Sequence, residues 1–244
     1  MKKVSVILTT YNSGDQLQEV IDSINNQEGK GELFELELLV VDDCSTDNTK
    51  DILVKNGVDF QKTSQNTGGP NHGRNLALKQ CAGEFICIAD HDDIWFSNKI
   101  KNLLAVSHIA TIVTSGYVLS DVSSLRKEVR VSKSVDKKGY LEYEKNETFL
   151  SKLIKSKVGQ QTYLGSILFH SSLKHILFEE ECGMIDFDWV LKLFYNQKSV
   201  EVCSVLYLRK VEGNNLSLNE QYRINDYYYS LKTISVYKRE YAAA

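Results

Sequence analysis

The sequence contains little that would divide the chain or cross-link it. It has a single proline among 244 residues and no low-complexity linker, so no domain boundary is indicated. Its five cysteines form an odd set without a Cys-x-x-Cys pair, which indicates neither a disulfide framework nor a zinc site. No apolar run approaches the roughly 20 residues needed to span a bilayer. These absences favour a protein of the reducing cytoplasm.

The charge balance excludes another broad class. A net charge of -3 and a pI of ≈ 6.0 argue against a general nucleic-acid binder, which would be basic. The contents of 42% hydrophobic and 25% charged residues are ordinary for a soluble globular protein. The length allows one large α/β domain or two small ones, with a substantial core.

Glycine-rich phosphate-binding patterns are incomplete. Residues 68–75 nearly match the P-loop, but Arg74 replaces the lysine that reaches the outer phosphates, and Asn75 replaces the hydroxyl residue that holds Mg²⁺. The first apolar run is not followed by the glycines of a dinucleotide fingerprint. A P-loop ATPase and a Rossmann oxidoreductase are therefore disfavoured, although the guanidinium of Arg74 suits a diphosphate.

Apolar runs alternate with helical patterns in the first hundred residues. Residues 4–8, 36–41 and 85–89 have the pattern of buried strands, and residues 58–60 that of a short one. This alternation predicts an α/β fold with a single, mostly parallel central sheet flanked by helices.

Polar residues follow these strands directly. The carboxyl ends of parallel strands share one edge of the sheet, and ligands bind outside that edge. Residues 9–12, Asp42, Asp43 and residues 90–93 should therefore face one crevice.

Three carboxylates, those of Asp90, Asp92 and Asp93, follow the run that ends at Ala89. Carboxylates gathered at a strand end repel one another, so a cation or ligand donors usually hold them together. The Asp90-His91-Asp92 spacing suits Mg²⁺ or Mn²⁺, which keep coordination positions open for substrate phosphates. An Asp-rich turn that caps the following helix is the structural alternative.

The second half carries weaker signals. Residues 94–106 have a helical pattern, residues 163–169 a strand pattern, and a further helix is predicted to begin near Asp186. Because a helix dipole favours carboxylates at its N-terminus, Asp186 and Asp188 also fit a purely structural role. The tyrosine-rich tail, residues 221–244, fits a helix docked on the body.

Four ordered segments resemble the signatures of one family. Residues 4–12 (VSVILTTYN), 39–49 (LVVDDCSTDNT), 66–76 (NTGGPNHGRNL) and 83–95 (GEFICIADHDDIW) are similar, in order and spacing, to the family 2 inverting glycosyltransferases. The likeness is thinner after the first hundred or so residues. It implies the GT-A fold with a small acceptor-side subsheet, a nucleotide-diphosphate-sugar donor, a divalent metal (Mn²⁺ or Mg²⁺) and inversion at the anomeric carbon.

The resemblance also implies roles for particular side chains. Asp92 would be the principal metal ligand, assisted by Asp90. The residues implied to bind the nucleotide are Thr9, Tyr11, Asn12, Asp42, Asp43, Arg74 and Asp90.

The catalytic base of the family is usually the Asp of a Glu-Asp pair, and Asp186 stands at that place. Ile185 replaces the preceding acid, so Asp188 is retained as the alternative base. The family often supplies a late histidine to the metal, but residues 210–212 contain none, which leaves Glu212, water or no third ligand.

The implied reaction is metal-dependent transfer of a sugar to a hydroxyl of a glycan or lipid-linked acceptor in surface polysaccharide biosynthesis. The segment 89–100 is similar to rhamnosyltransferase-type members, which use dTDP-sugars. The donor implied is therefore a dTDP-sugar or a UDP-sugar. The expected location is the cytoplasm, with a peripheral contact at the inner face of the membrane.

The expected organisation is a nucleotide-sugar-binding half at residues 1–110, an acceptor-binding and catalytic-base half at residues 111–220, and a helical tail at residues 221–244. A nucleotidyltransferase is disfavoured because no Gly-rich basic loop follows the first strand. A glycosidase using Asp186 and Asp188 and a non-catalytic sugar-nucleotide-binding subunit remain as alternatives.

Overall fold

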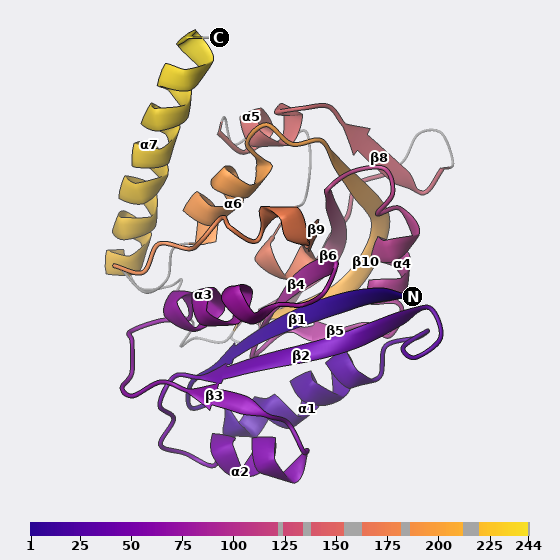
Figure 1. The fold of residues 1–244 in the computed structure, drawn as a ribbon, viewed down its shortest axis with the longest axis vertical. Coiled ribbons are helices and arrows are strands. Elements are labelled where there is room, and N and C mark those ends of the chain that lie inside the picture. The colour runs from indigo at the N-terminus through magenta and orange to yellow at the C-terminus, as the bar shows by residue number, and fades with distance from the viewer. Residues whose placement is uncertain (122–123, 134–137, 154–162, 182–185, 212–219, 244) are drawn as a thin grey trace.

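The computed structural model describes residues 1–121, 124–133, 138–153, 163–181, 186–211 and 220–243. They form one central sheet with helices on both faces (Figure 1). The strand order is β3-β2-β1-β4-β9-β6-β10-β5, with β7 paired to β6 and β8 to β10. The predicted α/β class is therefore confirmed.

The first four strands of the chain are mutually parallel, as the sequence predicts. They are β1 (Lys2–Thr10), β2 (Phe34–Asp42), β3 (Phe60–Lys62) and β4 (Phe85–Asp90). The register pairs Thr9 with both Val41 and Asp90, and Thr10 with Asp42. The polar residues that follow these strands therefore lie along one edge of the sheet.

The rest of the sheet mixes both directions. The short β9 lies antiparallel between β4 and β6, whereas β6 and β10 are parallel to each other. The strands β5, β7 and β8 add antiparallel pairs at the far side. These strands are β5 (Ile94–Trp95), β6 (Ile112–Asp121), β7 (Arg126–Arg130), β8 (Tyr140–Tyr143), β9 (Leu168–His170) and β10 (Ser199–Val211).

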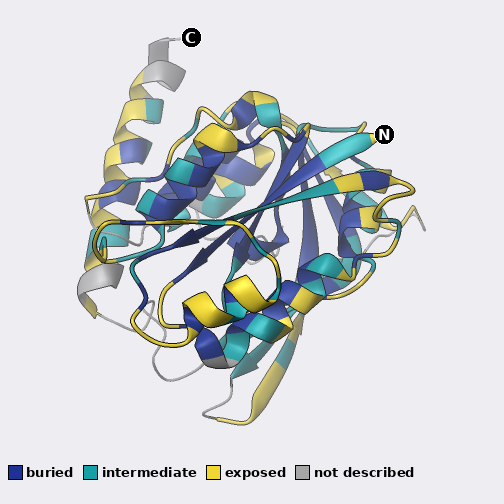
Figure 2. Ribbon diagram, turned by 60° about the horizontal axis from the view of Figure 1, so that its bottom comes forward, coloured by how far each residue is buried: buried dark blue, intermediate teal, exposed yellow. Residues whose placement is uncertain are grey.

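Two apolar clusters cover the two faces of the sheet, because successive strand residues point to opposite sides. Val6 and Leu8 join one cluster with α1, α2 and α4, whereas Ile7 joins the other with α3, α5, α6 and α7. Figure 2 shows the consequence, since the central strands are largely buried and the helices expose their outer sides. The helices are α1 (Gly14–Asn25), α2 (Thr49–Lys55), α3 (Asn71–Gln80), α4 (Lys99–Ala105), α5 (Glu147–Leu153), α6 (Asp186–Phe194) and α7 (Glu220–Ala243).

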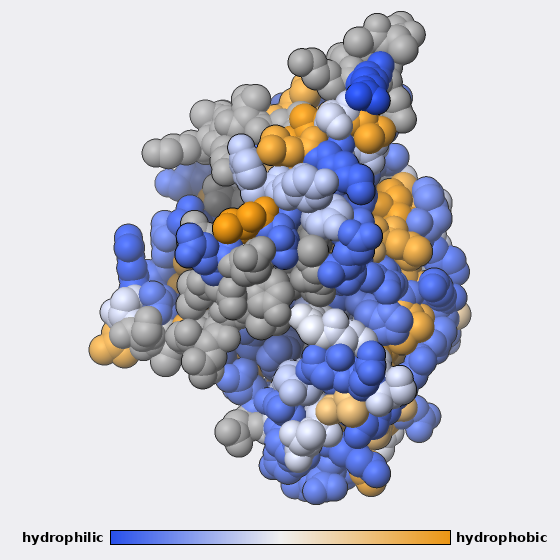
Figure 3. All heavy atoms as spheres, turned by 90° about the vertical axis from the view of Figure 1, so that its left-hand side faces the viewer, coloured by the Kyte–Doolittle hydropathy of each residue, from blue (hydrophilic) through white to orange (hydrophobic). Residues whose placement is uncertain are grey.

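The C-terminal helix α7 packs on α6 through Thr233, Ile234 and Tyr237. Its outer side carries apolar residues among hydrophilic ones, on the face drawn in Figure 3. The exposed large hydrophobic residues of α7 are Ile224, Tyr227, Tyr228, Leu231 and Val236. Within the described residues, no helix is long and apolar enough to cross a membrane.

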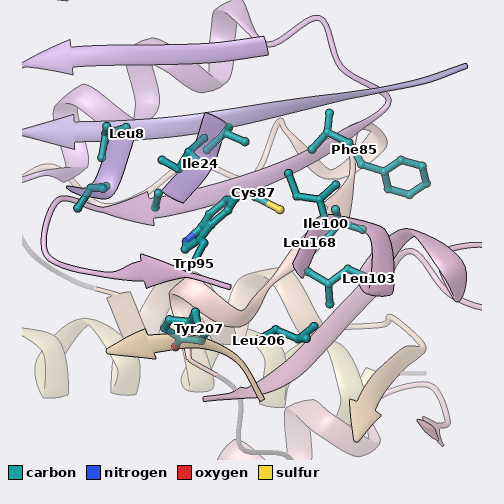
Figure 4. Packing of buried hydrophobic residues seen from close by; sticks show 14 of the residues in the cluster. Leu8, Ile24, Phe85, Cys87, Trp95, Ile100, Leu103, Leu168, Leu206 and Tyr207 are labelled. Atoms are coloured by element: carbon teal, nitrogen blue, oxygen red, sulfur yellow. The ribbon is translucent and has the colours of Figure 1, made fainter. Parts of the chain in front are cut away.

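Two segments differ from the sequence prediction. Ile94 and Trp95 form β5 rather than the start of a helix, because they pair with β10, and α4 begins only at Lys99. The predicted strand at 163–169 is divided into a 3-10 turn, η1 (Leu164–Ser166), and β9. Figure 4 shows Trp95 and Tyr207 in the buried cluster beneath the site described next.

Candidate active site

The site lies where β1, β2 and β4 end beside the start of α6, and Arg74 links β4 to α6. Arg74 on α3 is only 2% exposed. One Nη atom donates to Asp90 at 2.6 Å, and the other donates to Asp186 at 2.5 Å and to Asn71 at 3.0 Å. A carboxylate from the sheet edge and one from α6 are therefore held by the same guanidinium.

Two opposing effects act on Asp186. Burial raises the pKa of its carboxyl, while the guanidinium of Arg74 opposes that rise. Asp186 keeps 29% of its side chain exposed, so one side of the carboxylate remains accessible.

Two asparagines of α3 fix the segment that leads towards α6. Asn75 donates to the Phe178 carbonyl at 2.9 Å and accepts from the Phe178 N–H at 2.8 Å. Asn71 donates to the Glu179 carbonyl at 2.8 Å. Asn75 attracted attention in the sequence only as a departure from the P-loop, but its position identifies it as a structural clamp.

The two acids after β2 organise the neighbouring loops. Asp42 is fully buried and accepts from the Ser45 hydroxyl and N–H. Asp43 accepts from the Thr67 N–H at 3.0 Å and from the Thr63 hydroxyl at 2.9 Å. Both carboxylates therefore fix the loops beside the sheet edge, which is compatible with a role in nucleotide binding.

The other residues expected to bind the nucleotide lie along the same edge. Thr9 near the end of β1 is 5% exposed, whereas Tyr11 is 43% exposed. Asn12 has a positive φ of 47° and accepts from the Thr46 N–H at 2.9 Å. The structure thus brings the strand-end residues together as the parallel order predicts.

Asp92 and Asp93 lie close to other carboxylates, which repel their negative charges. Burial, followed by repulsion from Asp90, raises the pKa of Asp92. The pKa of Asp93 is raised more strongly by the same causes, and its side chain is 1% exposed.

Among the described residues no group of three or more His, Cys, Asp or Glu side chains is arranged to hold a metal ion. Asp90 and Asp92 supply oxygen donors of the kind that Mg²⁺ and Mn²⁺ use, and sites for these ions need only one or two carboxylates, with water and phosphate completing the shell.

The two candidate bases occupy different surroundings. Asp188 is fully buried, accepts from the Thr233 hydroxyl of α7, and pairs with Lys192 at 2.5 Å. Asp186 instead points towards the sheet edge, where Arg74 holds it. These contacts favour Asp186 as the base and a structural role for Asp188. Ile185 and Glu212 lie outside the described residues.

Sequence reasoning missed a second guanidinium in the site. Arg209 near the end of β10 stacks on Tyr163, with 3.9 Å between its Cζ atom and the ring centroid, and donates to the Tyr163 hydroxyl. Its charge opposes the rise in the pKa of Asp92, Asp93 and Asp186. Nothing local in the sequence around Arg209 indicates these partners.

The fold is that of an α/β protein with polar and acidic residues gathered at one sheet edge, and comparison with known proteins gives the family. The model of glycosyl transferase family 2 matches residues 5–175, which is more than half of the chain. The chain therefore belongs to glycosyl transferase family 2.

Two curated relatives each resemble part of the chain. The poly(ribitol-phosphate) beta-N-acetylglucosaminyltransferase TarS of Staphylococcus aureus is 43% identical over 110 residues, covering 43% of this chain and 19% of TarS. The GalNAc(5)-diNAcBac-PP-undecaprenol beta-1,3-glucosyltransferase of Campylobacter jejuni is 33% identical over 144 residues, covering 57% of this chain and 44% of that enzyme. The chain thus spans less than half the length of either relative.

Solved structures support the fold over nearly the whole chain. TarS residues 1-349 in complex with UDP superpose with a TM-score of 0.70 and 26% identity, covering 96% of this chain and 64% of that one. A Pyrobaculum calidifontis mannosyltransferase in complex with GDP-Man and Mn²⁺ gives a TM-score of 0.60 at 20% identity, covering 88% and 58%, which shows the fold alone. The expected GT-A fold is confirmed by these likenesses.

Proposed function

We propose that the chain transfers a sugar from a nucleotide-diphosphate donor to an acceptor hydroxyl, with inversion at the anomeric carbon. The observation that carries the proposal is the bridge from Asp90, through Arg74, to Asp186. A base that removes the proton of an attacking hydroxyl must lie within reach of the donor. The bridge holds the proposed base beside the strand edge that is proposed to bind the donor.

The proposed chemistry is a single displacement. The acceptor oxygen forms a bond to the anomeric carbon, and the bond from that carbon to the diphosphate oxygen breaks, with its electron pair leaving on the diphosphate. Asp186 takes the proton of the attacking hydroxyl. Because burial raises the pKa of Asp186, its carboxylate is a stronger base than an exposed one, while Arg74 continues to favour the ionised form.

The proposal includes a divalent metal, Mn²⁺ or Mg²⁺, held by Asp92 and Asp90. Support comes from the place of the two carboxylates at and just after the end of β4, where burial and repulsion from Asp90 raise the pKa of Asp92. When bound, the metal would stabilise the charge of the leaving diphosphate. A variant with Asp92→Ala should bind UDP equally well with Mn²⁺ and with chelator, unlike the wild type.

The donor proposed is a UDP-sugar, with dTDP-sugars as the alternative. Support for UDP comes from the likeness to TarS in complex with UDP and with UDP-GlcNAc. The acceptor proposed is a hydroxyl of a surface glycan, either a poly(ribitol phosphate), as in the name of TarS, or a lipid-linked saccharide, as in that of the Campylobacter jejuni enzyme. A cytoplasmic site of action with peripheral membrane contact remains part of this proposal.

The glycosidase alternative lacks support in the described residues. It requires two carboxylates that face one sugar, and Asp188 is fully buried against Thr233. A non-catalytic nucleotide-binding subunit is separated from an enzyme by the experiment that follows.

The test combines binding with turnover. Thermal shifts with UDP, dTDP, GDP and ADP, each with Mn²⁺ or chelator, identify the nucleotide because a ligand of the native state stabilises it. Release of UDP from UDP-GlcNAc and UDP-glucose, with and without poly(ribitol phosphate), then measures transfer and slow hydrolysis. We expect Asp186→Asn to lose turnover and keep the UDP shift. No shift with any nucleotide would overturn the proposed function, and a shift without turnover would favour the binding subunit.

A further inference from the structure

The pairing of β5 with β10 places Arg209 beside the acidic cluster. The antiparallel register pairs Tyr207 with Trp95 and Leu208 with Ile94. One residue after Leu208 on β10 and one residue before Ile94, Arg209 comes opposite Asp93. The position of the guanidinium therefore follows from backbone pairing as well as from its own contacts.

Tyr163 holds the Arg209 side chain but leaves most of its donors available. A guanidinium has five N–H donors, and in the described part of the chain Tyr163 is the only hydrogen-bond partner of Arg209. None of its nitrogens is among the buried unpaired atoms, so the remaining donors reach solvent at the site. Stacking on the tyrosine ring fixes the plane in which these donors lie.

The other guanidinium of the site is already engaged. Both Nη atoms of Arg74 donate to protein side chains, and the residue is 2% exposed. A diphosphate brought to this edge meets the carboxylates of Asp90 and Asp92, so an accessible cation of the protein would add to the positive charge of the proposed metal. Arg209 offers a forked set of donors of the kind that binds phosphate oxygens in pairs.

We propose that Arg209 is a further active-site residue, which binds the diphosphate of the nucleotide donor and stabilises the charge that develops there as the sugar leaves. Tyr163 orients the guanidinium, and the strand register places Arg209 beside Asp93. The assignment rests on the proposed function, because it needs a nucleotide-diphosphate ligand. It gives the chain a second positive centre for the leaving group, contributed by the acceptor-side half.

The test compares ligands that differ only in phosphate. Dissociation constants for UDP and uridine are measured by calorimetry with Mn²⁺ for wild type, Arg209→Gln and Arg209→Lys. Hydrogen bonds to charged groups predict that Arg209→Gln weakens UDP binding by about 10- to 100-fold and leaves uridine binding unchanged. Arg209→Lys should retain part of the UDP affinity because it keeps the charge but loses the fork.

Two controls make the result specific. Arg126→Gln removes the same charge at an exposed position of β7 and should leave both affinities unchanged. Tyr163→Phe removes the hydroxyl but keeps the ring, so it should weaken UDP binding less than Arg209→Gln does. Equal loss of UDP and uridine binding, or no loss of either in Arg209→Gln, overturns the assignment. Failure of the wild type to bind UDP or any other nucleoside diphosphate would instead refute the proposed function itself.

Discussion

Replacing Arg74 by methionine removes the cation shared by Asp90 and Asp186. Arg74 is 2% exposed and lies 2.6 and 2.5 Å from these carboxylates. Removing one partner of a buried ion pair costs about 3–5 kcal/mol, because the remaining charge is left uncompensated. The two carboxylates keep 22% and 29% of their side-chain exposure, so water can hydrate them, and we expect the lower end, about 3 kcal/mol.

The loss of stability in Arg74→Met should also depend on pH. Burial already raises the pKa of Asp186, and without Arg74 that pKa rises further. An acid whose pKa is higher in the folded state destabilises the fold progressively as the pH rises from the unfolded value, about 3.9, towards the folded value. The difference in the free energy of unfolding between wild type and Arg74→Met should therefore be smallest near pH 4. It should reach its full size above the pKa that Asp186 has in the folded variant.

The measurement is the free energy of unfolding from urea titrations at several pH values between about 4.5 and 8. Titratable groups common to both proteins cancel in the difference. A loss of about 3 kcal/mol corresponds to a fall in Tm of about 6–12 °C for a domain of this size. The same substitution at Arg130, whose pair with Glu128 is about 40% exposed, should cost less than about 1 kcal/mol. A loss below about 1 kcal/mol in Arg74→Met, or one independent of pH, would refute this reasoning.

Three further predictions concern buried groups. Asp188→Ala should lower the free energy of unfolding by about 1–3 kcal/mol, because Lys192 loses its partner, while the affinity for UDP stays unchanged; a weakened affinity would argue for a role in the site. Gly165→Ala should cost about 1–3 kcal/mol in urea titrations, since a Cβ there would lie 2.7 Å from Asp93 Oδ2, and a neutral effect would show that the turn adapts. Burial lowers the pKa of Lys99 to about 8, below the unfolded value of about 10.4. The free energy of unfolding of the wild type should therefore increase relative to that of Lys99→Met as the pH rises from about 8 to 10. A difference between the two proteins that does not change with pH would contradict this.

The strand-end residues were predictable because their signal is local. Apolar runs that end in Thr9, Asp42 and Asp90 specify strands, and the parallel order brings their carboxyl ends to one edge. The start of α6 at Asp186 was likewise visible from helical spacing. The resemblance to a family added roles for these residues, and those roles stay predictions.

The remaining part of the site depends on contacts between distant segments. Arg209 lies on β10, which pairs with β5, and Tyr163 stands just before the 3-10 turn η1 that precedes β9. The sequence predicted a helix where β5 lies and a continuous strand where η1 lies, so it did not indicate that the two residues meet. Lys99 shows the same limit. A lysine near a helix start is normally exposed, but Lys99 is fully buried over the rings of Trp95 and Tyr207.

The sheet cannot be completed from the N-terminal half alone. β9 pairs with β4 through His170 and Phe85, so a nascent chain exposes the free edge of β4 until residue 170 has emerged from the ribosome. Pairing across such a sequence separation slows folding, and an open apolar edge invites pairing with other chains. A truncated chain that ends before β9 should therefore aggregate, although it would still contain all four signature segments.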